Sequence, residues 1–293
     1  MTFRNFFLSL ALIGLTSSFT VNAQPFPSTY SPLPSEPVLI VNATLLTGTG
    51  ERIENGSLLI SDGRIQQVAS GNETIRAGDA QVIDAEGRWV TPGLIDVHSH
   101  LGVYASPGIK AHSDGNEATA PVTAQVWAEH SIWPQDPGFN RARAGGVTAM
   151  QILPGSANLI GGRGVTLKNV PSISYQAMKF PSAPHGLKMA CGENPKRVYG
   201  ERKQTPSTRM GNVAGYRAQW IEAQKYIQDW DEYEAKKDSK KNDKNGSENK
   251  TPTRDLRLET LAAVLKGEVL VHMHCYRADE MMTILDRADE LGC

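Results

Sequence analysis

Residues 90–100 read VTPGLIDVHSH, and this stretch decides how the rest of the chain is interpreted. Its apolar run predicts a β-strand that ends in two histidines. Residues i and i+2 of a strand face the same side, roughly 6.5 Å apart, so His98 and His100 point the same way at the carboxyl end of the strand. Two neutral imidazoles that converge there can ligate one divalent metal ion. Asp96 shares this face one step deeper, where it is placed to orient a ligand.

A second histidine pair repeats this spacing in the stretch VLVHMHCYRADE, at the end of another apolar run. Two strand ends that each carry such a pair are harder to explain as ordinary core histidines than one would be. His274, nearer the strand end, is the expected ligand. His272 is expected to lie deeper or to support a ligand.

A carboxylate or a lysine is the expected fourth donor. Glu193 follows the apolar stretch GLKMACG, where a loop ligand would lie, and we therefore prefer it. Lys188, inside that stretch, is the alternative, because a lysine can be carboxylated to a carbamate that bridges two metals. The spacing leaves both open, and in a third interpretation Glu193 caps the following turn or pairs with Lys196 or Arg197.

From residue 91 onward, apolar runs alternate with segments of helical composition. The runs are GLIDVHSH, GVTAMQILP, GVTLKNV, GLKMACG and EVLVHMHC. They are almost continuously apolar, as parallel strands covered on both faces tend to be. The repetition of strand, loop and helix predicts an α/β fold and favours a barrel, whose active site lies at the carboxyl ends of the strands.

Residues 37–90 are expected to form a small all-β unit. Short β-branched runs are separated by Gly-Thr-Gly and by the pairs Asn55-Gly56 and Asp62-Gly63. Both pairs tolerate positive φ, so they predict tight hairpin turns.

The first 23 residues have the pattern of a secretory signal peptide. Arg4 precedes an apolar core from Phe6 to Leu15, and Val21-Asn22-Ala23 suits cleavage. An apolar run of about 10 residues is too short to cross about 30 Å of hydrocarbon. We therefore expect an exported protein, periplasmic or secreted, with no membrane contact after cleavage. The Pro- and Ser-rich segment 24–36 is expected to be an extended linker.

The composition is that of an ordinary globular protein. Of 293 residues, 40% are hydrophobic and 21% are charged. The net charge of −1 gives no electrostatic argument for nucleic acid or for an anionic membrane surface. The three cysteines, Cys191, Cys275 and Cys293, are too few for a disulfide framework, although one bridge is compatible with them.

Two segments are expected to be irregular. Residues 231–255 contain almost no large apolar side chains, which predicts a solvated, mobile insertion. The stretch GSANLIGGRG at 155–164 lacks the strand, loop and helix context of a phosphate-binding loop. It is interpreted as a mobile loop over the barrel mouth, in which Arg163 would meet a substrate carboxylate.

Four motifs, in this order, resemble the amidohydrolase superfamily, in particular its imidazolonepropionase-like metal-dependent hydrolases. They are VTPGLIDVHSH, AGGVTAMQILPGSANLIGGRG, GLKMACGENPKRVYG and VHMHCYRADE, within a resemblance that spans about residues 37–293. The resemblance implies an incomplete (β/α)8 TIM-like barrel over 91–293, flanked by a β-sandwich to which 37–90 contributes. It assigns His98 and His100 as first-strand ligands, His274 as the fifth-strand ligand and Glu193 as the acidic ligand. One or two divalent ions are implied, with Zn expected, although these donors also suit Mn, Fe or Co.

The resemblance implies a hydrolase in which a metal-activated water attacks a C–N bond in a small amide, cyclic amide or peptide-like substrate. Members of the superfamily generally use an Asp after the eighth strand to move the proton. The sequence ends at Cys293, before such a strand, so we expect a truncated form of a longer gene product. Two alternatives stay open: a non-catalytic homologue that binds only metal or a partner, and a metal-dependent esterase or phosphoesterase.

Overall fold

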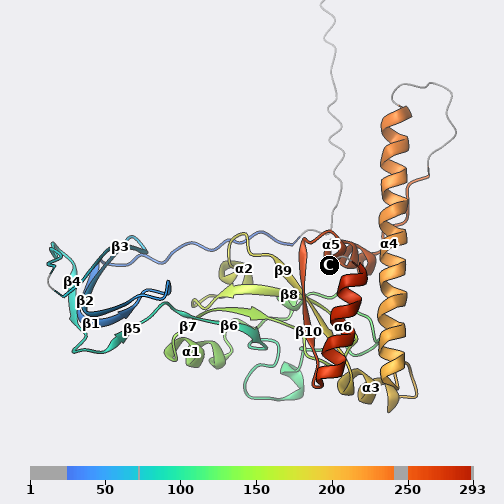
Figure 1. The fold of residues 1–293 in the computed structure, drawn as a ribbon, viewed down its shortest axis with the longest axis horizontal. Helices are drawn as coiled ribbons and strands as arrows, with labels where there is room; N and C mark the ends of the chain where they lie inside the picture. The colour runs from blue at the N-terminus through green and yellow to red at the C-terminus, as the bar shows by residue number, and fades with distance from the viewer. Residues whose placement is uncertain (1–24, 72, 241–249, 292–293) are drawn as a thin grey trace, which may run out of the picture.

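The computed structural model describes residues 25–71, 73–240 and 250–291. The predicted signal peptide, residues 1–23, lies outside these ranges. The described chain is built on two five-stranded sheets, a small one at one end of the molecule and a larger one beside the helices (Figure 1). Within the described ranges, no helix is both long enough and apolar enough to cross a bilayer.

The small sheet lies at the left of Figure 1 and contains the first five strands. Its order is β3-β2-β1-β4, and β5 also pairs with β1. The described residues of this region form one sheet, and the second layer of the expected sandwich is not among them. The strands are β1 (Val38–Leu46), β2 (Arg52–Ser61), β3 (Arg64–Ala69), β4 (Gln81–Asp84) and β5 (Trp89–Val90).

The two turn pairs of this sheet have different structures. Asp62-Gly63 joins β2 to β3 with φ values of 54° and 66°, so the predicted hairpin turn is confirmed. The prediction for Asn55-Gly56 is wrong, because this pair lies inside β2. There the register between β1 and β2 shifts, and Asn55 has a φ of 48°. The same tolerance of positive φ therefore makes a β-bulge here, and a Cβ on Gly56 would come within 2.6 Å of Leu45.

The larger sheet has the order β10-β9-β8-β7-β6. Its outer pairs, β6 with β7 and β9 with β10, are parallel, but β8 is antiparallel to both of its neighbours. The expectation of parallel strands throughout is thus wrong for β8, because only residues 153–159 connect it to β7, too few for a crossover helix. The strands are β6 (Leu94–Ser99), β7 (Val147–Ile152), β8 (Ile160–Lys168), β9 (His185–Ala190) and β10 (Val269–His274).

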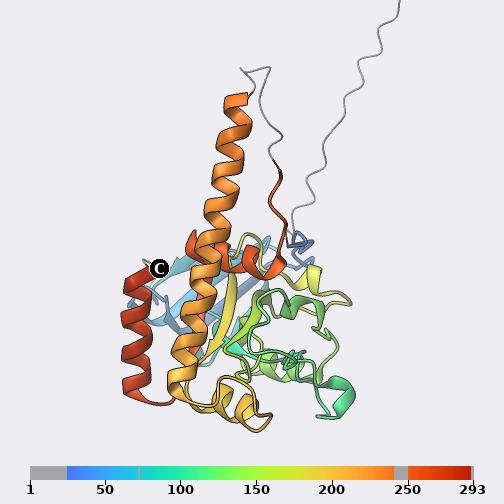
Figure 2. The ribbon, with the colours of Figure 1, turned by 90° about the vertical axis from the view of Figure 1, so that its right-hand side faces the viewer.

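Helices pack against one face of the larger sheet, which we call the helix face. One core cluster joins the sheet to α4 and α5 and includes Leu187, Trp220 and Leu261, while another includes Phe139 of α1. Figure 2 shows α4 and α6 on the same side of the sheet. The arrangement is an α/β half-barrel. The helices are α1 (Pro137–Ala144), α2 (Tyr175–Met178), α3 (Glu193–Gly200), α4 (Arg209–Lys240), α5 (Leu256–Leu265) and α6 (Ala278–Leu291), with 3-10 turns at Lys110–His112 and Ala128–His130.

The predicted irregular insertion at 231–255 is partly helical. Residues 231–240 continue α4, and 250–255 lead into α5, whose N-cap is Asp255. The prediction missed the helix because this part of α4 buries little apolar surface. Ion pairs three and four residues apart contribute there instead, such as Lys237–Glu234 at 3.3 Å and Lys236–Glu232 at 3.7 Å.

The described part of the predicted linker packs against the region of α2. Residues 25–37 contain no helix or strand. The Lys179 ammonium donates to the Phe26 carbonyl at 2.6 Å, and the Ser28 hydroxyl donates to the Lys179 carbonyl at 2.7 Å. This segment is therefore extended but fixed along α2.

Candidate metal centre

The face of the larger sheet opposite the helices, which we call the open face, carries five of the residues considered from the sequence. On β9, Leu187 points into the helix-side core, so its neighbour Lys188 points to the open face. Lys188 is in register with His272 on β10, and Ala190 with His274. His98 of β6 and His100, just beyond the end of that strand, reach the same place. We call His98, His100, Lys188, His272 and His274 the histidine–lysine cluster.

Lys188 lies at the centre of this cluster. Its side chain is buried, with 1% of its surface exposed. The Nζ atom lies 3.0 Å from Nε2 of His98 and donates to the Pro154 carbonyl at 3.1 Å. Burial lowers the pKa of the Lys188 ammonium to about 8. A lysine held in this way is closer to its neutral, nucleophilic form than a surface lysine is.

His100 is held in one tautomer by the backbone. Its Nδ1 lies 2.8 Å from the Leu153 carbonyl, and because a carbonyl only accepts, Nδ1 carries the proton. Nε2 therefore presents a lone pair. The ring contacts those of His98 and Tyr104, with centroids 5.1 Å and 5.7 Å away. This is the second-sphere arrangement that orients metal-binding imidazoles.

His274 is positioned by polar and covalent neighbours. The amide of Asn194 donates to its Nε2 at 3.3 Å, and the Tyr276 ring packs edge-on at 4.5 Å. The backbone N–H of Cys191 donates to the His274 carbonyl at 2.8 Å. Next to it, a disulfide joins Cys191 and Cys275, which the sequence allowed but did not require. The carboxyl ends of β9 and β10 are thereby fixed to each other.

Glu193, the preferred acidic ligand, is placed differently. It is the first residue of α3, just beyond β9, and its side chain is exposed. Among the described residues it makes no hydrogen bond or ion pair, so the pairing with Lys196 or Arg197 is not seen either. The partner of His98 in this structure is Lys188, the alternative donor.

Asp96 and His272, which were expected to support the ligands, also lie at this site. The Asp96 carboxylate accepts the backbone N–H of His98 at 3.1 Å, so it contacts the chain of the ligand rather than its ring. His272 packs closely on β9, since a Cβ on Gly186 would lie 2.6 Å from its ring. It therefore lies deeper than His274, as expected from the spacing.

All four histidines of the cluster are biased towards the neutral form. Burial is the largest cause of the lowered pKa of His98, His100, His272 and His274, and the Lys188 charge lowers each further. Neutral imidazoles are the form that binds metal ions.

The donors present fit a divalent metal if Lys188 contributes. No three His, Cys, Asp or Glu side chains in the described ranges are placed to hold an ion by themselves. The cluster offers neutral imidazole nitrogens but no carboxylate. A carbamate formed on Lys188 would supply the oxygen donors that this set lacks.

Sequence reasoning missed or misplaced several residues around this site. The Leu153 carbonyl and Asn194 have no recognisable motif, because they act through local geometry. The interpretation of 155–164 as a mobile loop over the mouth is wrong at its end, since residues 160–164 belong to β8. Arg163 is in register with Leu187 and lies on the helix face, against Thr260 of α5, so it does not face the cluster.

Comparisons of sequence show that this chain belongs to the amidohydrolase superfamily, although no family model matches it. It is 34% identical over 279 residues to Amidohydrolase tasK of Hapsidospora irregularis, which covers 87% of this chain and 28% of that relative. Over 106 residues it is 32% identical to the 5-methylthioadenosine/S-adenosylhomocysteine deaminase of Halalkalibacterium halodurans, with coverages of 35% and 22%. The chain thus spans less than a third of either curated relative.

A solved structure shows the same fold. The amidohydrolase from Thermotoga maritima superposes with a TM-score of 0.73 at 40% sequence identity. The match covers 87% of this chain and 62% of that one.

Proposed function

We propose, from the membership of this chain in the amidohydrolase superfamily, that it is a metal-dependent hydrolase. The reaction would cleave a C–N bond in a small amide, cyclic amide or peptide-like substrate. The observation that carries this proposal is the histidine–lysine cluster, which gathers donors from three strands on the open face. The resemblance drawn from four sequence motifs is confirmed by relatives that are themselves named amidohydrolases.

His98, His100 and His274 are the proposed imidazole ligands. Lys188, as a carbamate, is the proposed oxygen donor in place of Glu193. The support for this choice is geometric, because Lys188 is buried and contacts His98, whereas Glu193 is exposed on α3. When bound, a divalent ion such as Zn²⁺ would lower the pKa of a water and polarise the substrate carbonyl.

The surrounding residues hold these donors ready. The Leu153 carbonyl fixes the proton of His100 on Nδ1, and Asn194 orients the His274 ring. Tyr104 donates its hydroxyl proton to the Asn116 amide oxygen at 2.6 Å beside the His100 ring. These contacts exclude alternative rotamers, which reduces the entropy that is lost when a ligand binds.

Export to the periplasm or the medium is proposed as the location. The pattern of residues 1–23 suggests it, and the Cys191–Cys275 disulfide supports it, because such bonds persist mainly in oxidising compartments.

The test is hydrolysis of a matched panel of amide, ester and phosphoester substrates by the protein loaded with Zn²⁺. His98→Ala should lower the rate of amide hydrolysis by a factor of 1,000 or more. Its far-UV circular dichroism spectrum should be unchanged. His130→Ala removes an exposed imidazole outside the cluster and is the matched control. Unchanged turnover in His98→Ala would refute the site, and preference for esters or phosphoesters would refute the reaction class.

A further inference from the structure

Arg163 is a buried cation without a direct anionic partner. Only 7% of its surface is exposed. Its Nε donates to the Thr260 hydroxyl at 3.0 Å, and its guanidinium lies over the Trp127 ring at 4.5 Å. Within the described ranges no carboxylate forms an ion pair with it. Its two Nη atoms make no hydrogen bond within those ranges and are not fully buried. A buried charge in this condition is costly unless an anion joins it.

The nearby acids are already engaged or exposed. Glu129 accepts from the Lys179 ammonium at 2.7 Å, and Glu259 accepts from Arg254 at 2.6 Å and 2.8 Å. Glu268 is exposed just before β10. These carboxylates make the electrostatic potential around Arg163 less positive, but none of them pairs with its Nη atoms.

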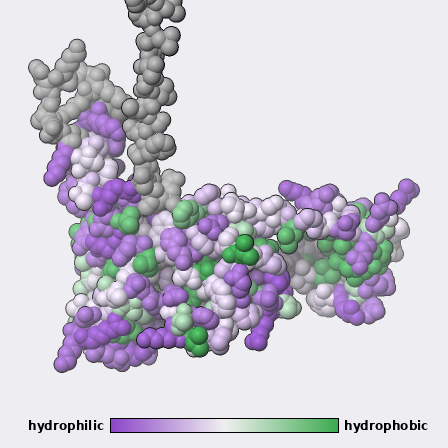
Figure 3. All heavy atoms as spheres, turned by 180° about the vertical axis from the view of Figure 1, so that it is seen from behind, coloured by the Kyte–Doolittle hydropathy of each residue, from purple (hydrophilic) through white to green (hydrophobic). Residues whose placement is uncertain are grey.

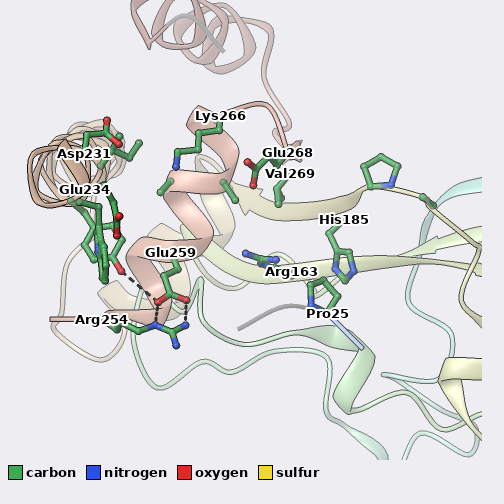
Figure 4. A pocket seen from close by; sticks show the side chains of 17 residues that line it. Pro25, Arg163, His185, Asp231, Glu234, Arg254, Glu259, Lys266, Glu268 and Val269 are labelled. Atoms are coloured by element: carbon green, nitrogen blue, oxygen red, sulfur yellow. Dashed lines mark hydrogen bonds and ion pairs between the residues drawn. The ribbon is translucent and has the colours of Figure 1, made fainter. Parts of the chain in front are cut away.

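A pocket of about 840 Å³ opens at this edge (Figure 4). It lies between α4, α5 and the first residues of β9 and β10, and in the figure Arg163 and His185 face Glu259 and Arg254 across it. Part of its wall is apolar, from Ala183, Pro184 and Ala262. A ligand with a carboxylate and a small apolar group fits this pocket. The carboxylate can form paired hydrogen bonds with the guanidinium, and the apolar group can pack against the apolar wall.

This pocket is separate from the histidine–lysine cluster. It adjoins Val269, the first residue of β10, whereas His274 ends that strand about 16 Å further on. Arg163 also lies on the helix face and Lys188 on the open face. A ligand in this pocket therefore does not touch the proposed metal ligands.

We propose that Arg163 anchors a second binding site, for a small apolar carboxylate, in the pocket between α4, α5 and the amino ends of β9 and β10. The carboxylate accepts two hydrogen bonds from the Nη edge of Arg163, and its apolar body lies against Pro184 and Ala262. This site does not depend on the proposed hydrolytic activity.

The test compares phenylacetate with phenylacetamide, which has nearly the same shape but no charge. Titration calorimetry and thermal unfolding of the full protein should show binding and stabilisation with phenylacetate, and at least tenfold weaker binding of phenylacetamide. Arg163→Gln should weaken phenylacetate binding tenfold or more. Arg163→Lys keeps the positive charge but cannot form the paired hydrogen bonds of a guanidinium. It should weaken phenylacetate binding less than Arg163→Gln does.

Two further variants locate the site. Lys168→Gln removes another cation from β8 and should leave binding unchanged. His98→Ala should also bind phenylacetate normally, which separates this site from a product bound at the cluster. Equal binding of the amide, no binding by the wild type, unchanged binding by Arg163→Gln, loss of binding in His98→Ala, or stabilisation by inorganic phosphate alone would each overturn the proposal.

Discussion

Strands β9 and β6 have similar sequences but very different surroundings. GLKMAC and GLIDVH are both short, mostly apolar and followed by polar residues. In β9, every residue from Gly186 to Ala190 is buried, whereas in β6 only Ser99 is, and Ile95 and Val97 are each 68% exposed. β9 lies between two strands and under helices, while β6 is a sheet edge among the described strands.

The difference shows that position in the sheet, rather than hydrophobic pattern, decides how firmly a site residue is held. Lys188 on β9 is enclosed on all sides, and His98 on β6 is exposed. The small sheet gives the same lesson, because Ile65, Val82 and Trp89 are also exposed. Figure 3 shows apolar side chains gathered on that end of the molecule.

The largest expected effect comes from removing the enclosed donor. Lys188→Met keeps most of the side-chain volume but cannot form a carbamate. We expect amide hydrolysis to fall by a factor of 1,000 or more. The free energy of unfolding should stay within about 1 kcal/mol, because a buried amine no longer has to be desolvated. Steady-state kinetics and urea unfolding measure the two quantities. A variant that unfolds in buffer would show that the amine is structural instead.

The disulfide beside His274 should have the next largest effect. It closes a loop with a sequence separation of 84 residues, for which chain entropy predicts about 4.6 kcal/mol of stability. Replacing both Cys191 and Cys275 by Ser should lower the free energy of unfolding by that amount in urea. The variant should then be insensitive to dithiothreitol, whereas the wild type should lose stability when it is reduced. Equal stability of the oxidised and reduced wild type would contradict the role of this bond in joining β9 to β10.

A pair of truncations tests the contrast between β9 and β6 itself. Leu187→Ala on β9 removes a fully buried side chain and should cost about 3 kcal/mol. Val97→Ala on β6 removes an exposed one and should cost less than about 0.5 kcal/mol. Chemical unfolding of both variants gives the difference. Similar costs would mean that further protein covers β6 in solution.

The first residue of β9 predicts a pH dependence. Burial, followed by the charges of Lys179 and Arg163, lowers the pKa of His185 from 6.5 to about 4. The folded state therefore binds fewer protons than the unfolded chain between these values, and stability rises with pH there. We expect full stability above about pH 6.5 and a loss of up to about 3 kcal/mol as pH falls to 4. His185→Gln should flatten this part of the profile, and an unchanged slope would contradict the assignment.

The placement of the candidate ligands was largely predictable from the sequence, because period-2 spacing and strand ends are local properties. His98, His100 and His274 lie at the predicted strand ends for that reason. The contribution of Lys188 was left open, since spacing shows which face a residue takes but not how deeply it is buried. Arg163 was misplaced because its glycine neighbours suggested a loop, whereas they allow β8 to pass closely by other chains: a Cβ on Gly162 would lie 2.4 Å from the Val126 carbonyl oxygen.

The fold was predictable to a similar degree. Apolar runs identified the five strands of the larger sheet, but their pairing depends on connection lengths, which made β8 antiparallel. The end of α4 was missed because charges rather than apolar side chains stabilise it. Asn55-Gly56 was misassigned because positive φ suits both a turn and a bulge.

The central claim is that Lys188, and not Glu193, completes the metal site with the three histidines. Titration of Zn²⁺ into metal-free protein in bicarbonate buffer tests it most directly, with wild type, Lys188→Met and Glu193→Gln in parallel. The account predicts that Lys188→Met binds Zn²⁺ at least a hundredfold more weakly than wild type and that Glu193→Gln binds it equally well. Weak binding by Glu193→Gln with wild-type binding by Lys188→Met would contradict it.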